Sequence, residues 1–248
     1  MLKLFTIEGY NHLLELALNN DYAFIDFDKS IIDKTEKLCL LRHDIDADLK
    51  AAFAMSEIEA SLGIKATYFL MLRSPVYNLF GRQNHKFTEG ILKNGHAIAL
   101  HYDEGFYPAN NRNLQEHIEA EANILENMFG QKIRTVSFHQ PGPKIISNEI
   151  RIKNYINTYD KEDLKDIQYF SDSNKVWKKD NAWEIFEKGE HKKIHLLIHP
   201  MWWITEKEYS TEELWDKVLL DNIGRSMNQI VETERAFGNK RSVKINKE

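Results

Sequence analysis

The sequence has a single cysteine, Cys39, so it cannot form an intramolecular disulfide framework. It has no run of about 20 apolar residues that could span a bilayer. Residues 1–20 also lack the apolar core of a signal peptide. From these absences we expect a cytoplasmic protein without a membrane span. Because Cys39 lies in an apolar segment, we expect a packed, reduced thiol rather than a nucleophile.

Positive charge is not concentrated anywhere in the chain. Lys and Arg total 33 against 38 Asp and Glu, which gives a net charge of −5. Without a basic block, nucleic-acid binding is a poor first interpretation. The chain is nevertheless 42% hydrophobic, enough for a sizeable core, and its 248 residues suit one large α/β domain better than two small ones.

Predicted strands and helices alternate from residue 38 onward. Strand-like segments follow at 38–46, 66–72, 96–101, 133–139, 167–172 and 194–199. Helical apolar spacing is found at 51–62, 88–93, 114–129 and 210–237, and residues 77–87 are predicted to form a loop. This alternation predicts a mostly parallel sheet covered by helices, and polar residues at the strand ends favour a barrel over an open sheet.

Five of these strands end in ionisable residues. In a parallel barrel such ends meet on one face, where carboxylates and imidazoles could bind a divalent metal and supply an acid–base pair. Asp44 and Asp46 are two residues apart, so an extended backbone directs both to one side and a cation would relieve their repulsion. Asp46 could instead cap the following helix. The strand-end residues are Asp44, Asp46, His101, His139, Asp172 and His199.

The ordered motifs resemble the polysaccharide deacetylase superfamily, the nodulation-type carbohydrate esterases of family four and their relatives. They are Arg42-His43-Asp44-Ile45-Asp46, Gly95-His96-Ala97-Ile98-Ala99-Leu100-His101 and Leu196-Leu197-Ile198-His199. More narrowly, the chain is similar to an uncharacterised Arg-His-Asp-x-Asp branch of that superfamily. The resemblance implies a distorted (β/α)7-type barrel. We expect one domain over 1–248, with an N-terminal appendage (1–37), a motif-bearing barrel (38–203) and a C-terminal helix and tail (204–248).

The resemblance also implies roles for particular residues. Asp44 matches the general base, Asp46 and His101 match metal ligands, and His199 matches the catalytic acid. Two features depart from the pattern. The usual second metal His falls at Gly105, and the Arg-Pro-Pro-Tyr motif, whose Arg orients the base, is replaced by His139-Gln140-Pro141-Gly142. We therefore expect His139 to be the third ligand of a divalent metal, Zn²⁺ being the expected ion. The alternatives are a ligand from Asp103 or Glu104, or no metal at all.

The resulting hypothesis is a metal-dependent hydrolase of a C–N amide bond that removes an N-acetyl group from a sugar used in surface-polysaccharide biosynthesis. The alternatives are hydrolysis of another or a cyclic amide, and a non-catalytic carbohydrate-binding or assembly protein on the same fold. The partner would be a small or oligomeric sugar. Segment 210–237 could pack on its own barrel or on a second copy of the chain, so a homo-oligomer is possible.

Five residues near the strand ends are candidates for substrate contact. An arginine could bind a carboxylate or phosphate, and an aromatic ring could stack on a sugar. An aspartate in this group could also keep His199 charged. The candidates are Arg42, Arg73, Tyr102, Asp172 and Trp202.

Overall fold

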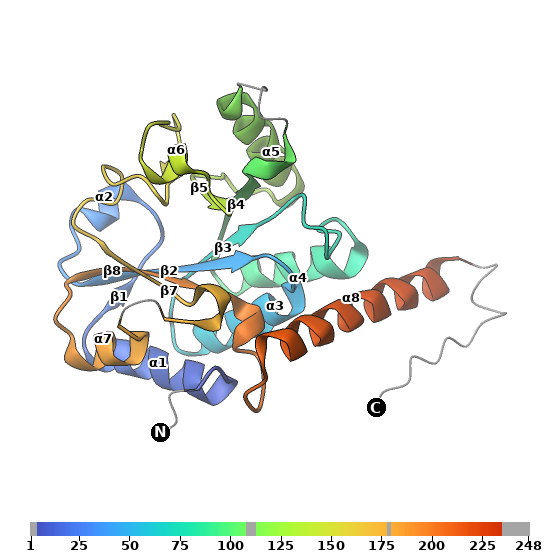
Figure 1. The fold of residues 1–248 in the computed structure, drawn as a ribbon, viewed down its shortest axis with the longest axis horizontal. Helices are drawn as coiled ribbons and strands as arrows, with labels where there is room; N and C mark the ends of the chain where they lie inside the picture. Colours follow the sequence, from blue (N-terminus) through green and yellow to red (C-terminus); the bar gives the residue numbers. More distant parts are fainter. Residues whose placement is uncertain (1–3, 108–112, 178–179, 235–248) are drawn as a thin grey trace.

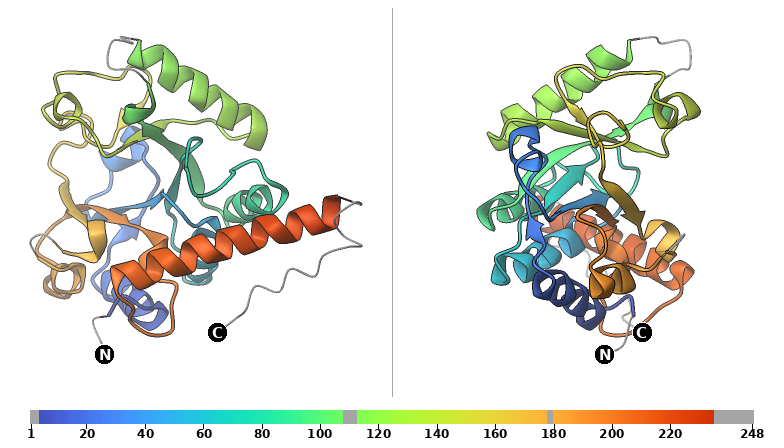
Figure 2. Two further views of the ribbon diagram at one scale, coloured as in Figure 1. Left: turned by 45° about the vertical axis from the view of Figure 1, so that its right-hand side comes forward. Right: turned by 90° about the vertical axis from the view of Figure 1, so that its left-hand side faces the viewer.

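A computed structural model describes residues 4–107, 113–177 and 180–234. At its centre, parallel strands form a sheet that curls into a partial barrel with helices outside it (Figures 1 and 2). The strand order is β6-β5-β4-β3-β2-β8-β7, and β1 pairs with the start of β2. The barrel-like α/β fold of parallel strands is thus confirmed. The strands are β1 (Ala23–Phe24), β2 (Leu38–Ile45), β3 (Thr67–Leu70), β4 (Ala97–Asp103), β5 (Thr135–His139), β6 (Ile156–Asn157), β7 (Gln168–Ser171) and β8 (Lys193–Ile198).

Helices cover the outside of the sheet and connect its parallel strands. Helix α3 packs beside α4, and α1 packs beside α7 (Figure 1). The α-helices are α1 (Ile7–Asn19), α2 (Lys29–Ile32), α3 (Leu49–Ser61), α4 (Arg82–Lys93), α5 (Leu114–Phe129), α6 (Pro143–Ile146), α7 (Ala182–Lys188) and α8 (Thr211–Thr233). The described residues also form the short 3₁₀ turns η1 (Glu104–Phe106), η2 (Ser173–Lys175) and η3 (Pro200–Trp202).

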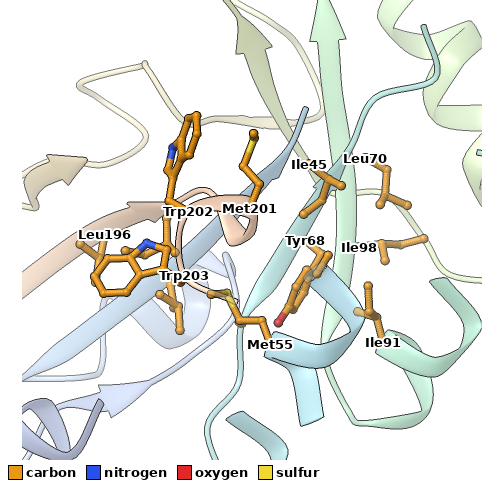
Figure 3. Close-up of a cluster of buried hydrophobic side chains, with 14 of the residues drawn as sticks. Ile45, Met55, Tyr68, Leu70, Ile91, Ile98, Leu196, Met201, Trp202 and Trp203 are labelled. Atoms are coloured by element: carbon orange, nitrogen blue, oxygen red, sulfur yellow. The ribbon is translucent and has the colours of Figure 1, made fainter. Parts of the chain in front are cut away.

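Strand β2 is the centre of the core. It lies between β3 and β8, and every one of its residues is buried. The surrounding core contains Met55, Tyr68 and Trp203 (Figure 3). Because β2 also carries Arg42, His43 and Asp44, these buried polar groups must find partners inside the protein.

Several predicted helix ends are confirmed. Ser210 and Glu213 form a reciprocal capping box at the start of α8. Gly63 and Gly130 lie just after α3 and α5 with φ of +71° and +69°, the left-handed conformation that glycine adopts without steric cost.

Other features differ from the sequence-based predictions. Helix α4 begins at Arg82, inside the predicted loop, because its first turns are too polar to show apolar spacing. Helix α1 of the N-terminal segment contacts the body of the protein, since Tyr10 is fully buried and Trp183 of α7 donates a hydrogen bond to the Gly9 carbonyl. The expected helix end near Phe237 and the tail beyond it lie outside the described residues.

A membrane-spanning helix is not found among the described residues, since none of their helices combines the necessary length with the necessary apolar character.

Candidate metal centre

Three potential metal ligands meet at the carboxyl ends of adjacent strands. Asp46 follows β2, His101 lies in β4 and His139 ends β5, which pairs directly with β4. Asp46 Oδ1 lies 3.1 Å from His101 Nε2 and 3.4 Å from His139 Nδ1. One ligand atom from each residue lies within 4.8 Å of the others. The expected metal-binding residues are therefore neighbours in space.

The buried oxygen of Asp46 suggests what this cluster binds. Asp46 Oδ1 is buried and makes no hydrogen bond, despite its two imidazole neighbours. A buried polar atom without a partner is costly, so a bound cation would supply the missing interaction. One carboxylate with two imidazoles is a donor set suited to a divalent metal, and three protein ligands leave an open coordination position. The residues present therefore fit a divalent metal site.

A second contact fixes the orientation of one ligand. His101 Nδ1 lies 2.7 Å from Ser137 Oγ on the neighbouring strand, which leaves Nε2 directed at Asp46. Such an outer partner selects the imidazole tautomer and holds the ring. Burial opposes the charge of Asp46, but His101 and His139 outweigh burial and hold the pKa of this carboxyl well below its usual value. Asp46 is therefore available as a carboxylate.

The other expected source of a third ligand is used differently. Asp103 Oδ1 accepts a hydrogen bond of 3.1 Å from the Gly105 N–H. Glu104 Oε2 accepts one of 2.8 Å from the Gly142 N–H. Both carboxylates thus stabilise loop backbone, and His139 is the better candidate ligand.

Asp44 is held rigidly next to the three ligands. Arg42 donates to both of its oxygens, from Nε to Oδ1 at 2.8 Å and from Nη2 to Oδ2 at 2.6 Å. Asp44 Oδ2 lies 3.7 Å from His101 Nε2. Burial opposes ionisation, yet Arg42 outweighs it and keeps the pKa of Asp44 below its usual value. This gives an ionised carboxylate in a fixed position.

The predicted role of Arg42 in substrate contact does not fit its position. Its side chain is fully buried and also donates to Thr158 Oγ1 at 2.9 Å. Arg42 and Asp44 lie two residues apart, and alternate residues of a strand share a face. The two-residue spacing could therefore have predicted from the sequence that the Arg42 guanidinium pairs with Asp44, the candidate base.

His199 faces the same site from the other side. Its Nδ1 lies 2.6 Å from Asp172 Oδ1, and its Nε2 lies 3.8 Å from Asp46 Oδ2. Asp172 Oδ2 accepts a further hydrogen bond of 2.8 Å from Trp203 Nε1. Burial lowers the pKa of His199, but Asp172 outweighs burial and raises it to about 9. His199 is therefore oriented and kept protonated.

Three more of the expected substrate contacts are buried in the structure. Asp172 is fully buried and paired with His199, so it positions that imidazole instead. Tyr102 is only 1% exposed because it follows His101 and must point to the opposite face of β4. Trp202 is only 4% exposed and packs against Trp215 of α8.

Arg73 is the one expected substrate contact that keeps partial exposure, with 32% of its side chain accessible. It donates to Glu121 Oε1 at 2.7 Å and lies over the Phe106 ring at 3.8 Å. Phe106, in the loop after β4, is 52% exposed. Arg73 and Phe106 therefore form an accessible cationic and aromatic surface near the strand ends.

Comparison with known proteins gives distant structural similarity only. No family model and no curated protein matches the sequence. A family 4 acetyl xylan esterase from Clostridium thermocellum, in complex with a cobalt ion, is 11% identical with a TM-score of 0.45, over 79% of this chain and 91% of that chain. A family 4 carbohydrate esterase from Bacillus anthracis is 13% identical with a TM-score of 0.44, over 88% and 91%.

A third similar structure is a pseudoenzyme. It is a carbohydrate esterase family 4 protein from Bacillus anthracis, 13% identical with a TM-score of 0.44. The match covers 77% of this chain and 62% of the length of that protein. All three belong to the group that the sequence motifs resemble. Similarity this remote leaves the function to be argued from the side chains at the strand ends.

Proposed function

We propose that this protein is a metal-dependent hydrolase that removes an N-acetyl group from a sugar. One observation carries the proposal: the buried Asp46 Oδ1, which makes no hydrogen bond, lies between two imidazoles and beside a fixed carboxylate and a fixed imidazolium. A divalent metal held by Asp46, His101 and His139 would supply a Lewis acid that polarises the amide carbonyl and acidifies a water.

Asp44 is suited to act as the general base. Arg42 holds it ionised and fixes both of its oxygens, so Asp44 can take the proton of the attacking water without reorienting. The hydrogen bonds from Arg42 also prevent the Asp44 side chain from rotating to become a fourth metal ligand beside Asp46, His101 and His139. Arg42 is thus a positioning residue.

His199 is suited to act as the general acid. A protonated imidazole can give its Nε2 proton to the leaving amine nitrogen as the C–N bond breaks, and Asp172 stabilises the charge before that transfer. The amine departs neutral and the acyl group leaves as acetic acid, which loses its proton to water. The proton held by Asp44 returns through solvent to His199, which restores both residues.

The substrate part of the proposal rests on the accessible surface near the strand ends. Phe106 offers an exposed ring for a sugar face, and Arg73 a cation for an acidic group. The proposed substrate is a sugar intermediate of surface-polysaccharide biosynthesis, handled in the cytoplasm.

Acetate release tests this function directly. Purified protein loaded with Zn²⁺ would be assayed against N-acetylglucosamine, its oligomers and a UDP-linked form, beside Asp44→Asn and His199→Gln variants. The proposal is supported if the wild type releases acetate and each substitution abolishes that release while the metal content stays unchanged. Metal binding without release from any N-acetyl sugar, but with cleavage of cyclic amides, would favour another amide hydrolase. Sugar binding with neither activity would favour a carbohydrate-binding protein on this fold.

A further inference from the structure

Helix α8 is apolar on two opposite faces. One face packs on the body through Leu214 and Val218, which are buried. On the other side, Leu220, Ile223 and Ile230 are 60%, 53% and 44% exposed. With 3.6 residues per turn, these three and the half-buried Met227 form a line on the side of the helix away from the body. Figures 1 and 2 show α8 along the outside of the molecule, its C-terminal end reaching beyond the other helices.

The spacing within this exposed line indicates that its partner is a helix. Scattered surface apolar residues need no explanation, whereas a continuous line along one helix marks an interaction site. From Leu220 through Ile223 and Met227 to Ile230, the steps are three, four and three residues. That is the spacing of the seam in helices that pack side by side as coiled coils.

The line is also symmetrical about one position. Leu220 and Ile230 each lie five residues from Arg225, and Ile223 and Met227 each lie two residues from it. Two antiparallel copies of α8, crossing at this level, would place Leu220 against Ile230 of the second copy and Ile223 against its Met227. A two-fold interface requires such self-complementarity. We propose that α8 is an antiparallel dimerisation helix and that its partner is a second copy of this chain.

Charge at the crossing point favours this pairing. The residues flanking the line there are Gly224 and Ser226, which are small and uncharged, so two helices can approach without opposing like charges. Arg225 is turned toward its own body, where it donates to Asn222 Oδ1 at 2.7 Å and to Asp48 Oδ1 at 3.2 Å. Its charge is therefore kept out of the seam.

The proposed dimer does not depend on the proposed hydrolase activity. Its interface is small. Standard interfaces use about 20–30 residues a side, so a seam of this length gives a weak, concentration-dependent dimer.

Sedimentation velocity of the full chain over a range of concentrations tests the dimer. The wild type shifts from monomer to dimer as concentration rises, and Ile223→Glu stays monomeric. The matched control, Ile124→Glu on helix α5, changes an isoleucine that is 43% exposed and should dimerise like the wild type. A wild type that is monomeric throughout, or an Ile223→Glu variant that still dimerises, overturns the proposal.

Cysteine cross-linking tests the orientation. In the antiparallel pair Ile223 of one copy faces Met227 of the other at the same level across the seam, whereas the two Thr233 positions are about 24 Å apart along the axis. Disulfides need Cα atoms within about 7 Å, so mild oxidation of mixed variants should link Ile223→Cys to Met227→Cys and leave Thr233→Cys unlinked. The native Cys39 is buried and does not interfere. Linking of Thr233→Cys as efficiently as the mixed pair would contradict the antiparallel arrangement.

Discussion

Strand β2 serves two buried charged clusters, one on each face, and they differ in how fully their atoms are bonded. His43 points to the Glu59 cluster, in which Glu59 accepts hydrogen bonds from Tyr10 and Tyr68 and lies 2.6 Å from His43 Nε2. Asp44 points to the opposite face, beside the three-ligand cluster of Asp46, His101 and His139. Both Glu59 oxygens accept hydrogen bonds, while Asp46 Oδ1 makes none.

This difference separates a structural cluster from a binding site. A buried carboxylate with all its partners inside the protein stabilises the fold and has no need of a ligand. A buried carboxylate oxygen without a hydrogen bond lowers the stability of the fold. A protein keeps such an oxygen where a bound ligand completes the contact. The following changes test that distinction, in order of decreasing expected effect.

Asp44→Asn should have the largest effect, on activity alone. Removing a general base lowers kcat by about 10²–10⁴-fold, while the metal ligands stay in place. The measurements are acetate release and metal content on the same sample. Loss of metal together with activity would show that Asp44 is a ligand and not the base.

Glu59→Gln should lower the free energy of unfolding by about 3–5 kcal/mol, since it removes one partner of a buried charged cluster. In metal-free protein, Asp46→Asn should cost less, because Asp46 Oδ1 makes no hydrogen bond and the substitution removes only its charge interactions with His101 and His139. Urea unfolding of both variants in the presence of a chelator measures the contrast. Equal losses would remove the distinction between the two clusters.

Metal should stabilise the folded protein. At a free Zn²⁺ concentration about 100 times the dissociation constant, linkage contributes about 2.7 kcal/mol, which raises the melting temperature by several degrees. The rise should disappear in His101→Ala and persist in His85→Ala, whose histidine pairs with Glu89 outside the three-ligand cluster. A rise of the same size in both variants would place the metal elsewhere.

Arg42→Lys should reduce kcat by about 10–100-fold, because lysine keeps the charge but not the two parallel hydrogen bonds to Asp44. KM and metal content should stay near the wild-type values. A change confined to KM would restore the sequence-based prediction that Arg42 contacts substrate.

The smallest expected effect is on acid stability. Burial opposes the charge of Glu59, but His43 outweighs it and lowers the pKa of Glu59 below its ordinary value of 4.5. A lowered folded-state pKa means that this stabilisation is present above pH 4.5 and is lost as pH falls below it. Urea unfolding across that range should show a steeper loss in the wild type than in Glu59→Gln, and parallel curves would contradict the assignment.

The sequence predicted the residues that gather at the strand ends better than it predicted their partners. Asp46, His101 and His139 could be found because each follows an apolar run, and parallel strands bring such ends together. Glu59 could not, since an acidic residue in helix α3 looks like an ordinary surface residue until tertiary packing buries it. Contacts between distant segments leave no local pattern.

The same limit explains the corrections among the substrate candidates. Aromatic residues beside a strand end were expected to face the site, but strand alternation turns Tyr102 outward toward Tyr107. Arg42 was expected at the rim, and its spacing from Asp44 instead places it inside the barrel. The residue types were informative, and the face on which each one lies decided its role.

The central claim is that Asp46, His101 and His139 hold a metal, and metal content tests it most directly. Protein purified without chelator and supplied with Zn²⁺ would be analysed by inductively coupled plasma mass spectrometry, as wild type, His139→Ala and His85→Ala. We expect about one metal ion per chain in the wild type and in His85→Ala, and a large loss in His139→Ala. Metal retained in His139→Ala would contradict the assigned ligand set, and no metal in any of the three would contradict the metal centre itself.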